Sequence, residues 1–272
     1  MVRKIRGCPS RVVSPMLKYK HPASYNQQLL NALDKLVPDT GVILDFFGGV
    51  GKVGALARAG RIIIAGEIEK KWANQSVDNG CDFVVIADAT RSPFKSNSID
   101  AVVVSPSYGN RLADVDKSQR RRKKRKSDYT RRTYRSYYGK DLHINNSGNN
   151  MQWVRGPRGK AYRLLHFRAW LEAARLLKVG GLLIINCKDH IRNGKWMHVC
   201  DWHWSMVERI GFEQRIRLEI PTTGDQNQNR HKQQGKRVVA YEQIAVYKKV
   251  SNLIPHERYL IHHAEAEVLD YI

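Results

Sequence analysis

Short, continuously apolar runs alternate with amphipathic stretches along the first third of the chain, and this alternation restricts the possible folds more than any other feature. Three such runs occupy 42–46, 61–67 and 83–88, and helices are predicted between them at 50–59 and 69–79. Strands buried on both faces are apolar throughout, whereas half-exposed strands alternate apolar and polar residues. The pattern therefore predicts an α/β fold with a parallel sheet covered by helices on both faces.

The rest of the chain repeats this pattern after an interruption, and its 42% hydrophobic content is enough for a sizeable core. The remaining predicted elements are a strand at 99–104, a helix from 161 that ends at Gly180-Gly181, a strand at 182–186, a helix at 199–210, and strands at 212–220 and 241–248. With 272 residues, we expect one domain over 1–250, with a basic insertion at 112–160 and a helical tail at 251–272.

The first three predicted strands each end in an acidic residue, namely Asp45, Glu67 and Asp88. Parallel strands share one carboxyl edge, and open α/β folds bind their ligands there. One acid at such a position can equally be the N-cap of the following helix. Three acids in register favour a ligand site.

A glycine cluster follows the first strand, and Gly49, Gly51 and Gly54 match the pattern G-x-G-x-x-G between a strand and a helix. A nucleoside triphosphate loop is excluded, because its motif requires Gly and Ser or Thr where this chain has Phe46 and Val53. A dinucleotide and S-adenosylmethionine both remain, since Glu67 suits the ribose of either. Asp45 favours S-adenosylmethionine, because a carboxylate repels pyrophosphate and attracts an ammonium or sulfonium group.

Ser105-Pro106-Ser107-Tyr108 directly follows the apolar run that forms the fourth predicted strand. Proline lacks an N–H group and cannot continue a strand ladder, so the chain must break at this point. The break presents a hydroxyl group, a freed carbonyl group and an aromatic ring. These groups fit a planar ligand that carries an NH₂ group, such as a nucleobase.

The chain carries a formal net charge of +22, which favours a polyanionic partner. The segment 117–140 has twelve basic residues and one acid, Asp128, so it accounts for half of this charge. Four tyrosines lie within the same segment. Such a segment can be a solvated loop, or can contact nucleic acid through phosphates and stacked bases.

Neither a secretory signal nor a run of about 18 apolar residues is present in the sequence. We therefore expect a cytoplasmic protein that binds no membrane. The four cysteines form no C-x-x-C pair. A group of possible ligands lies within one short segment, but its spacing matches no common zinc module: Cys187, His190, His198, Cys200 and His203. No metal is expected.

Two motifs resemble those of one family. Asp45-Phe46-Phe47-Gly48-Gly49-Val50-Gly51 resembles Asp-Pro-Phe-x-Gly-x-Gly, the cofactor motif of class I methyltransferases that modify exocyclic amino groups, with Phe46 in place of proline. Ser105-Pro106-Ser107-Tyr108 resembles their catalytic tetrapeptide, [Asp/Asn/Ser]-Pro-Pro-[Tyr/Phe/Trp], with Ser107 in place of the second proline. The resemblance covers roughly 18–111 and 160–248.

The resemblance implies a Rossmann-like, mostly parallel, seven-stranded sheet and S-adenosylmethionine as the cofactor. It assigns Asp45 to the methionine part of the cofactor, Glu67 to the ribose and Asp88 to the adenine. Phe47, Gly49 and Gly51 match motif positions, and the segment with His21 loosely resembles one that closes over the methionine moiety. His21 can instead simply precede a helix at Leu29, Leu30 and Leu33.

The resemblance also implies catalysis by Ser105, Pro106 and Tyr108 on a DNA base. Serine at the first tetrapeptide position favours cytosine N4 over adenine N6. The candidate nucleic-acid contacts are Asn110, Arg111, Arg121, Arg122, Lys124, Arg131, Arg230 and Lys232. Lys188-Asp189-His190 either lines the target pocket or has a structural role. The alternatives are an RNA amino-methyltransferase, a nicotinamide oxidoreductase and a non-catalytic nucleic-acid-binding protein on the same fold.

Overall fold

The computed structural model describes residues 2–4, 25–106, 157–192, 195–222, 233, 235 and 237–252. The chain forms two compact units. One contains residues 1–106 and 169–255, and the other contains residues 107–168 and 256–272. The predicted sheet and the described residues of the candidate site lie in the first unit. In the second unit, the described residues are the first part of one helix. The predicted domain boundaries stay a prediction.

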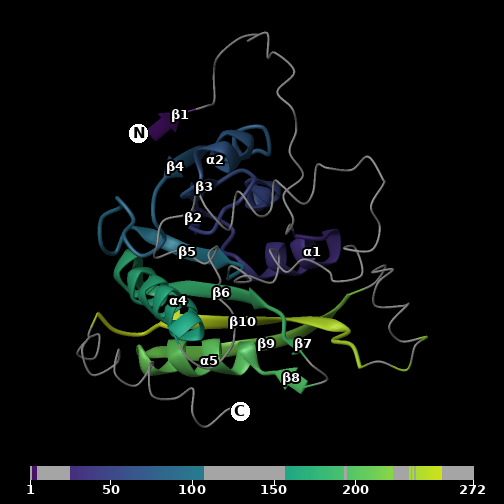
Figure 1. Cartoon of the computed structure of the whole chain (residues 1–272). Helices are drawn as coiled ribbons and strands as arrows, with labels where there is room; N and C mark the ends of the chain where they lie inside the picture. The colour runs from purple at the N-terminus through teal and green to yellow at the C-terminus, as the bar shows by residue number, and fades with distance from the viewer. Residues whose placement is uncertain are drawn as a thin grey trace. The chain divides into compact units, whose positions relative to one another are not determined.

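One large sheet organises the first unit (Figure 1). In spatial order its strands are β1 (Val2–Lys4), β4 (Phe83–Ile86), β3 (Arg61–Glu67), β2 (Gly41–Asp45), β5 (Ile99–Val104), β6 (Leu177–Cys187), β10 (Tyr241–Lys249) and β9 (Phe212–Pro221). The five central strands, from β4 to β6, are parallel, and β10 is antiparallel to both of its neighbours.

This topology is the Rossmann-like class I methyltransferase fold, as the sequence predicts. Seven strands correspond to the predicted sheet, and β1 adds an eighth that pairs antiparallel with β4. A separate hairpin of β7 (His190–Arg192) and β8 (Lys195–Met197) follows β6. Sequence periodicity does not predict β1, β7 or β8, because three-residue strands are too short to show a period.

The helices differ from prediction at two places. The segment expected as a helix at 50–59 is a short 3₁₀ helix, η1 (Lys52–Leu56), because Gly51 precedes it in the left-handed conformation and Gly54 lies within it. The helix α4 (Pro157–Leu176) ends before Gly180-Gly181, and β6 runs through these glycines. The other helices that the structure describes are α1 (Gln27–Leu36), α2 (Lys70–Ser76) and α5 (Val199–Arg209), and the last two match their predicted segments.

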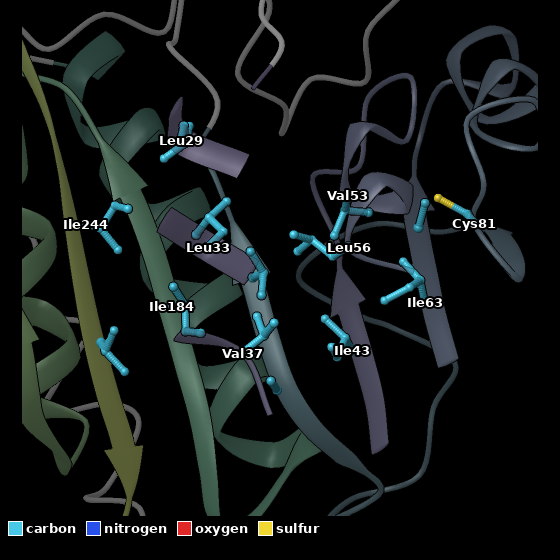
Figure 2. Close-up of a cluster of buried hydrophobic side chains, with 14 of the residues drawn as sticks. Leu29, Leu33, Val37, Ile43, Val53, Leu56, Ile63, Cys81, Ile184 and Ile244 are labelled. Carbon is cyan, nitrogen blue, oxygen red and sulfur yellow. The ribbon is translucent and has the colours of Figure 1, made fainter. Parts of the chain in front are cut away.

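The hydrophobic core on one face of the sheet lies under α1 and η1 (Figure 2). Leu29 and Leu33 of α1 pack in one cluster with every second residue of the central strands, including Ile43, Ile184 and Ile244. The opposite face is covered by α5, where Trp204 lies 6.2 Å from Tyr247 between ring centroids. Strand alternation therefore assigns each residue of the central strands to one of two covered faces.

Within the part of the chain that the structure describes, no helix is long and apolar enough to span a membrane.

Candidate functional site

Asp45 is the last residue of β2 and is almost completely buried, with 3% of its surface exposed. Its Oδ1 accepts a hydrogen bond from the Phe47 backbone N–H at 2.9 Å, and its Oδ2 accepts one from the Tyr25 hydroxyl at 3.1 Å. Burial raises the pKa of Asp45 to about 7, against the lowering effect of these two bonds. Two hydrogen bonds therefore do not replace the lost hydration, and a cation would stabilise the carboxylate.

Glu67 ends the adjacent strand β3 and orders the glycine turn. Its Oε2 accepts from the Gly49 N–H at 2.8 Å, and its Oε1 accepts from the Glu69 N–H at 2.9 Å. Burial raises the pKa of Glu67 to about 7, and the charges of Glu69 and Asp45 contribute to this rise. Each oxygen keeps one lone pair for a ligand hydroxyl. Glu67 can therefore order the glycine turn and still make the predicted contact with a ribose.

The glycines let the turn after β2 lie directly against the end of α2. Gly51 has a φ of +75°, and a Cβ there would lie 2.5 Å from the Ser76 Cβ. The Ser76 hydroxyl donates to the Gly49 carbonyl at 3.1 Å, and Asn79 Nδ2 donates to the Val50 carbonyl at 2.7 Å. The sequence contains no signal for Ser76 or Asn79, because their importance depends on this tertiary approach.

The backbone N–H groups of the three turn glycines Gly48, Gly49 and Gly51 are already hydrogen-bonded within the protein. Gly48 donates to the Gly66 carbonyl at 2.9 Å, Gly49 donates to Glu67, and Gly51 donates to the Gly48 carbonyl at 2.7 Å. Loops that bind pyrophosphate direct such groups at the ligand and continue into an α-helix. This turn continues into the short 3₁₀ helix η1. The geometry therefore disfavours a dinucleotide.

Asp88 lies two residues beyond the end of β4 and is half-buried. Its Oδ1 accepts from the Thr90 N–H at 2.8 Å and from the Thr90 hydroxyl at 2.9 Å. These bonds form a local turn that fixes the carboxylate at the carboxyl edge of the sheet. The adenine role that the resemblance implies for Asp88 stays a prediction.

Ser105 and Pro106 directly follow β5, which lies between β2 and β6 in the sheet. Ser105 is partly exposed, and Pro106 is buried. Because β2 and β5 are parallel neighbours, Asp45 and Ser105 lie at the same edge of the sheet, at the ends of adjacent strands. The fold thus brings together the two motifs that are 60 positions apart in the sequence.

Several predicted residues lie outside the described part of the chain. They are His21, Ser107, Tyr108, Asn110, Arg111, Arg121, Arg122, Lys124, Arg131, Arg230 and Lys232. Their assigned contacts stay predictions.

Asp189 has a structural role, which is one of the two roles that the sequence allows for it. It is buried, and its two oxygens accept from the Cys200 N–H at 2.9 Å and from Trp196 Nε1 at 2.9 Å. The carboxylate thereby binds the first turn of α5 and fixes the β7–β8 hairpin to it. Lys188 Nζ donates to the Thr222 hydroxyl at 3.3 Å. Among the described residues, no group of three or more His, Cys, Asp or Glu side chains is arranged to hold a metal ion.

Comparison with known proteins gives similarities of structure only. Neither a protein-family model nor a curated protein sequence matches this chain. Among solved structures, a TehB-like S-adenosylmethionine-dependent methyltransferase from Corynebacterium glutamicum has 15% identity and a TM-score of 0.43, and the match covers 81% of this chain and 86% of that one.

Two further solved structures are similarly distant. YcgJ from Bacillus subtilis has 11% identity and a TM-score of 0.44, with 82% of this chain and 98% of that chain covered. TrmN from Thermus thermophilus has 14% identity and a TM-score of 0.44, and the match covers 82% of this chain and 48% of that chain. With similarities this low, the fold assignment rests on the strand order of this chain, and no site residue is transferred from these proteins.

Proposed function

We propose that this protein transfers a methyl group from S-adenosylmethionine to the exocyclic amino group of a DNA base, with cytosine N4 favoured over adenine N6. The observation that carries the proposal is that Asp45 and Ser105-Pro106 end two adjacent parallel strands at one edge of the sheet. One position suits a cationic ligand, and the other suits an amino group. Methyl transfer between them requires this proximity.

The residues around Asp45 fit S-adenosylmethionine better than a nicotinamide dinucleotide. The buried Asp45 carboxylate is incompletely compensated, so it favours a ligand with an ammonium and a sulfonium group. Glu67 retains acceptor capacity for ribose hydroxyls. When bound, the cofactor supplies a methyl group on a positively charged sulfur. The bonded N–H groups of the glycine turn argue against a pyrophosphate.

Ser105 and Pro106 would act on the acceptor nitrogen. The lone pair of an exocyclic amino group is delocalised into the base, so the nitrogen is a poor nucleophile. Hydrogen bonds from its NH₂ group to the Ser105 hydroxyl and the Pro106 carbonyl would localise the lone pair and orient it. After transfer the nitrogen releases a proton to solvent, so no strong base is required.

The choice of a nucleic-acid substrate rests on charge. The chain has a net charge of +22, and half of it falls within 117–140. Such an excess attracts phosphates and favours a polynucleotide over a small neutral substrate. DNA is favoured because the sequence contains no recognisable RNA-binding module. An RNA base is the second candidate, since the chemistry at Ser105 is the same.

The proposal separates cofactor binding from methyl transfer, and two variants test the two parts. Cofactor affinity is measured by titration calorimetry, and transfer is measured with methyl-labelled cofactor on DNA and RNA. Asp45→Asn should weaken cofactor binding by about tenfold or more, because it removes the counter-charge. Ser105→Ala should leave cofactor binding unchanged and reduce transfer by about tenfold or more.

Ser98→Ala is the matched control, because Ser98 lies just before the other end of β5, and its hydroxyl donates to the Lys95 carbonyl at 2.6 Å. This variant should keep both cofactor binding and transfer. Full turnover by Ser105→Ala would refute the role of the tetrapeptide. Unchanged cofactor affinity in Asp45→Asn would refute the assignment of Asp45.

A further inference from the structure

Asn186 is a buried polar residue near the end of β6, and neither motif accounts for it. Only 2% of its surface is exposed. Its Nδ2 donates a hydrogen bond to Glu242 Oε2 at 2.9 Å, whereas its Oδ1 is buried without a hydrogen-bond partner among the described residues. A buried carbonyl oxygen without a partner destabilises the fold, because its lost hydration is not replaced. Such a group in a native fold calls for an explanation.

Glu242 determines which atom of the amide is left without a partner. The Glu242 carboxylate is an acceptor when ionised, so it pairs with the NH₂ side of the amide. Rotation of the amide by 180° would place Oδ1 against a carboxylate oxygen and lose this bond. The unpaired group is therefore an acceptor, and the ligand that satisfies it must donate a hydrogen bond.

The sheet register places Asn186 beside Ser105. Val104 of β5 pairs with Ile185 of β6, so the next pair in register is Ser105 and Asn186. Val103 and Ile184, two residues earlier, both belong to the core cluster under α1 (Figure 2 labels Ile184). Because side chains alternate along a strand, Ser105 and Asn186 are assigned to the same face. Ile43 is in that cluster too, which assigns Asp45 to this face.

We propose that Asn186 Oδ1 accepts a hydrogen bond from the target amino group, so that Asn186 and Ser105 together hold its two hydrogens. This inference rests on the proposed function and refines it, because Asn186 on the neighbouring strand β6 then takes the hydrogen that was assigned above to the Pro106 carbonyl. Glu242 is a positioning residue, since it acts by fixing the orientation of the Asn186 amide.

The spacing of the strands suits this arrangement. Two acceptors that bind the two hydrogens of one NH₂ group, at about 2.9 Å each, lie about 5 Å apart. Neighbouring strands are separated by about 4.8 Å. Residues opposite each other on β5 and β6 can therefore contact one nitrogen. A base must be out of its stack to reach an enclosed oxygen, as in other enzymes that modify bases.

The departure from the family motif at Ser107 also favours a second acceptor outside the tetrapeptide. A residue that precedes proline has a restricted backbone, which fixes the direction of its carbonyl group. Pro106 precedes Ser107 instead of proline, so this restriction is absent. An acceptor on the rigid strand β6 would restore a defined second hydrogen bond to the amino group.

The test compares Asn186→Leu with the wild-type protein in the label-transfer assay on DNA and RNA. Leucine has a similar shape and lacks the acceptor. It also loses the hydrogen bond to Glu242, but removal of the unpaired buried oxygen offsets this loss, so the melting temperature should change little. We expect unchanged cofactor affinity and a loss of kcat/KM of about 10–100-fold. In Glu242→Gln the glutamine carbonyl can still accept the hydrogen bond from Asn186. This variant should therefore lose less kcat/KM than Asn186→Leu.

A competition assay gives a second readout that a structural role would not change. Unlabelled random-sequence oligonucleotides compete for transfer, with the modified base either intact or replaced by its oxo analogue (deoxyuridine for deoxycytidine, deoxyinosine for deoxyadenosine). The wild-type protein should prefer the amino form by about tenfold, and Asn186→Leu should lose most of this preference, since only the Ser105 contact of the pair remains.

The two proposals fail in different ways. Absence of wild-type transfer to any nucleic acid refutes the proposed function and the role of Asn186 with it. Wild-type transfer with normal turnover and a preserved amino preference in Asn186→Leu refutes the role of Asn186 alone. An equal loss of kcat/KM in Asn186→Leu and Glu242→Gln, with a lowered melting temperature in both, would likewise refute the role of Asn186. The Asn186–Glu242 pair would then only stabilise the fold.

Discussion

At the scale of single residues, the candidate site depends on carboxylates whose charge is only partly stabilised. Asp45 is buried and Glu67 is partly buried at the carboxyl edge, and the pKa of each is raised to about 7. Each accepts hydrogen bonds that hold a local turn in place. A cationic ligand completes the environment that burial leaves deficient in positive charge.

This electrostatic arrangement predicts that cofactor binding strengthens as the pH rises. A cation binds the ionised form of Asp45, so binding releases a proton at a pH below the pKa of the free protein. Affinity for S-adenosylmethionine should rise from about pH 6 and level off above about pH 7. Titration calorimetry in buffers of different ionisation enthalpy measures both the affinity and the released proton. Affinity that is independent of pH, with no proton release, would contradict this prediction.

The same raised pKa predicts a stability effect in the free protein. Between about pH 4 and pH 7 folded Asp45 keeps a proton that the unfolded chain has released, so stability falls as the pH rises through this range. Above about pH 7 folded Asp45 is ionised, and its burial lowers the free energy of unfolding by a few kcal/mol. Asp45→Asn has no charge to bury, so it removes this destabilisation. Its melting temperature should exceed that of the wild type at pH 8, and the difference should shrink toward pH 4. A variant less stable than wild type at pH 8 would contradict this.

At the scale of elements, sequence periodicity predicts the strands well and the turns poorly. The runs at 61–67 and 99–104 coincide with β3 and β5, because strands buried on both faces are apolar throughout. The α-helix predicted at 50–59 is wrong, because Gly51 and Gly54 allow this segment to pack closely against Ser76 and Asn79. A Cβ at Gly54 would lie 2.1 Å from the Asn79 carbonyl oxygen. Local patterns contain no information on such a tertiary approach.

Asp45, Glu67 and Ser105 can be predicted from sequence motifs, whereas the side-chain pairings of Tyr25, Ser76 and Asn186 emerge only from the fold. Each of the latter acts through a partner far away in the sequence. Tyr25 binds Asp45, Ser76 binds the Gly49 carbonyl, and Asn186 binds Glu242. A single polar residue next to an apolar run carries no signal of such pairing, so sequence patterns cannot assign it.

The glycine turn leads to a prediction with a matched control. Gly51 and Gly180 both have positive φ, of +75° and +88°. An added Cβ at Gly51 meets Ser76 at 2.5 Å, whereas at Gly180 its nearest neighbour is the flexible Lys248 side chain at 3.8 Å. Gly180→Ala should therefore cost about 1 kcal/mol of unfolding free energy from backbone strain alone.

Gly51→Ala should cost about 3 kcal/mol or more, because overpacking adds to the same strain. It should also weaken cofactor binding, since the turn that carries Gly49 must shift. Urea denaturation of both variants and cofactor titration measure these effects. Equal destabilisation by the two substitutions would show that the approach of the turn to α2 does not constrain Gly51.

At the scale of the whole molecule, charge is distributed unevenly along the chain. The segment 117–140 accounts for +11 of the net +22. The sheet and its helices carry the candidate cofactor and catalytic residues. The basic segment is expected to supply affinity for the polynucleotide backbone. Phosphate contacts release counterions, so binding that depends on them weakens steeply with salt.

Deleting 117–140 should therefore weaken DNA binding and flatten its dependence on salt. On duplex DNA, the slope of log affinity against log salt concentration becomes shallower by about 0.9 for each phosphate that the protein no longer neutralises. Fluorescence anisotropy at several salt concentrations measures this slope for the wild-type and deleted chains. Cofactor affinity, measured in parallel, should stay the same. An unchanged slope would assign the segment no part in nucleic-acid binding.

The central claim is tested most directly by identifying the methylated nucleoside. The protein is incubated with methyl-labelled S-adenosylmethionine and with DNA or RNA, the polymer is digested, and the nucleosides are separated by chromatography and mass spectrometry. The proposed function predicts label in DNA, on N4 of deoxycytidine before N6 of deoxyadenosine, and its loss in Ser105→Ala. Absence of label from both polymers, with cofactor bound at the site of Asp45, would contradict it.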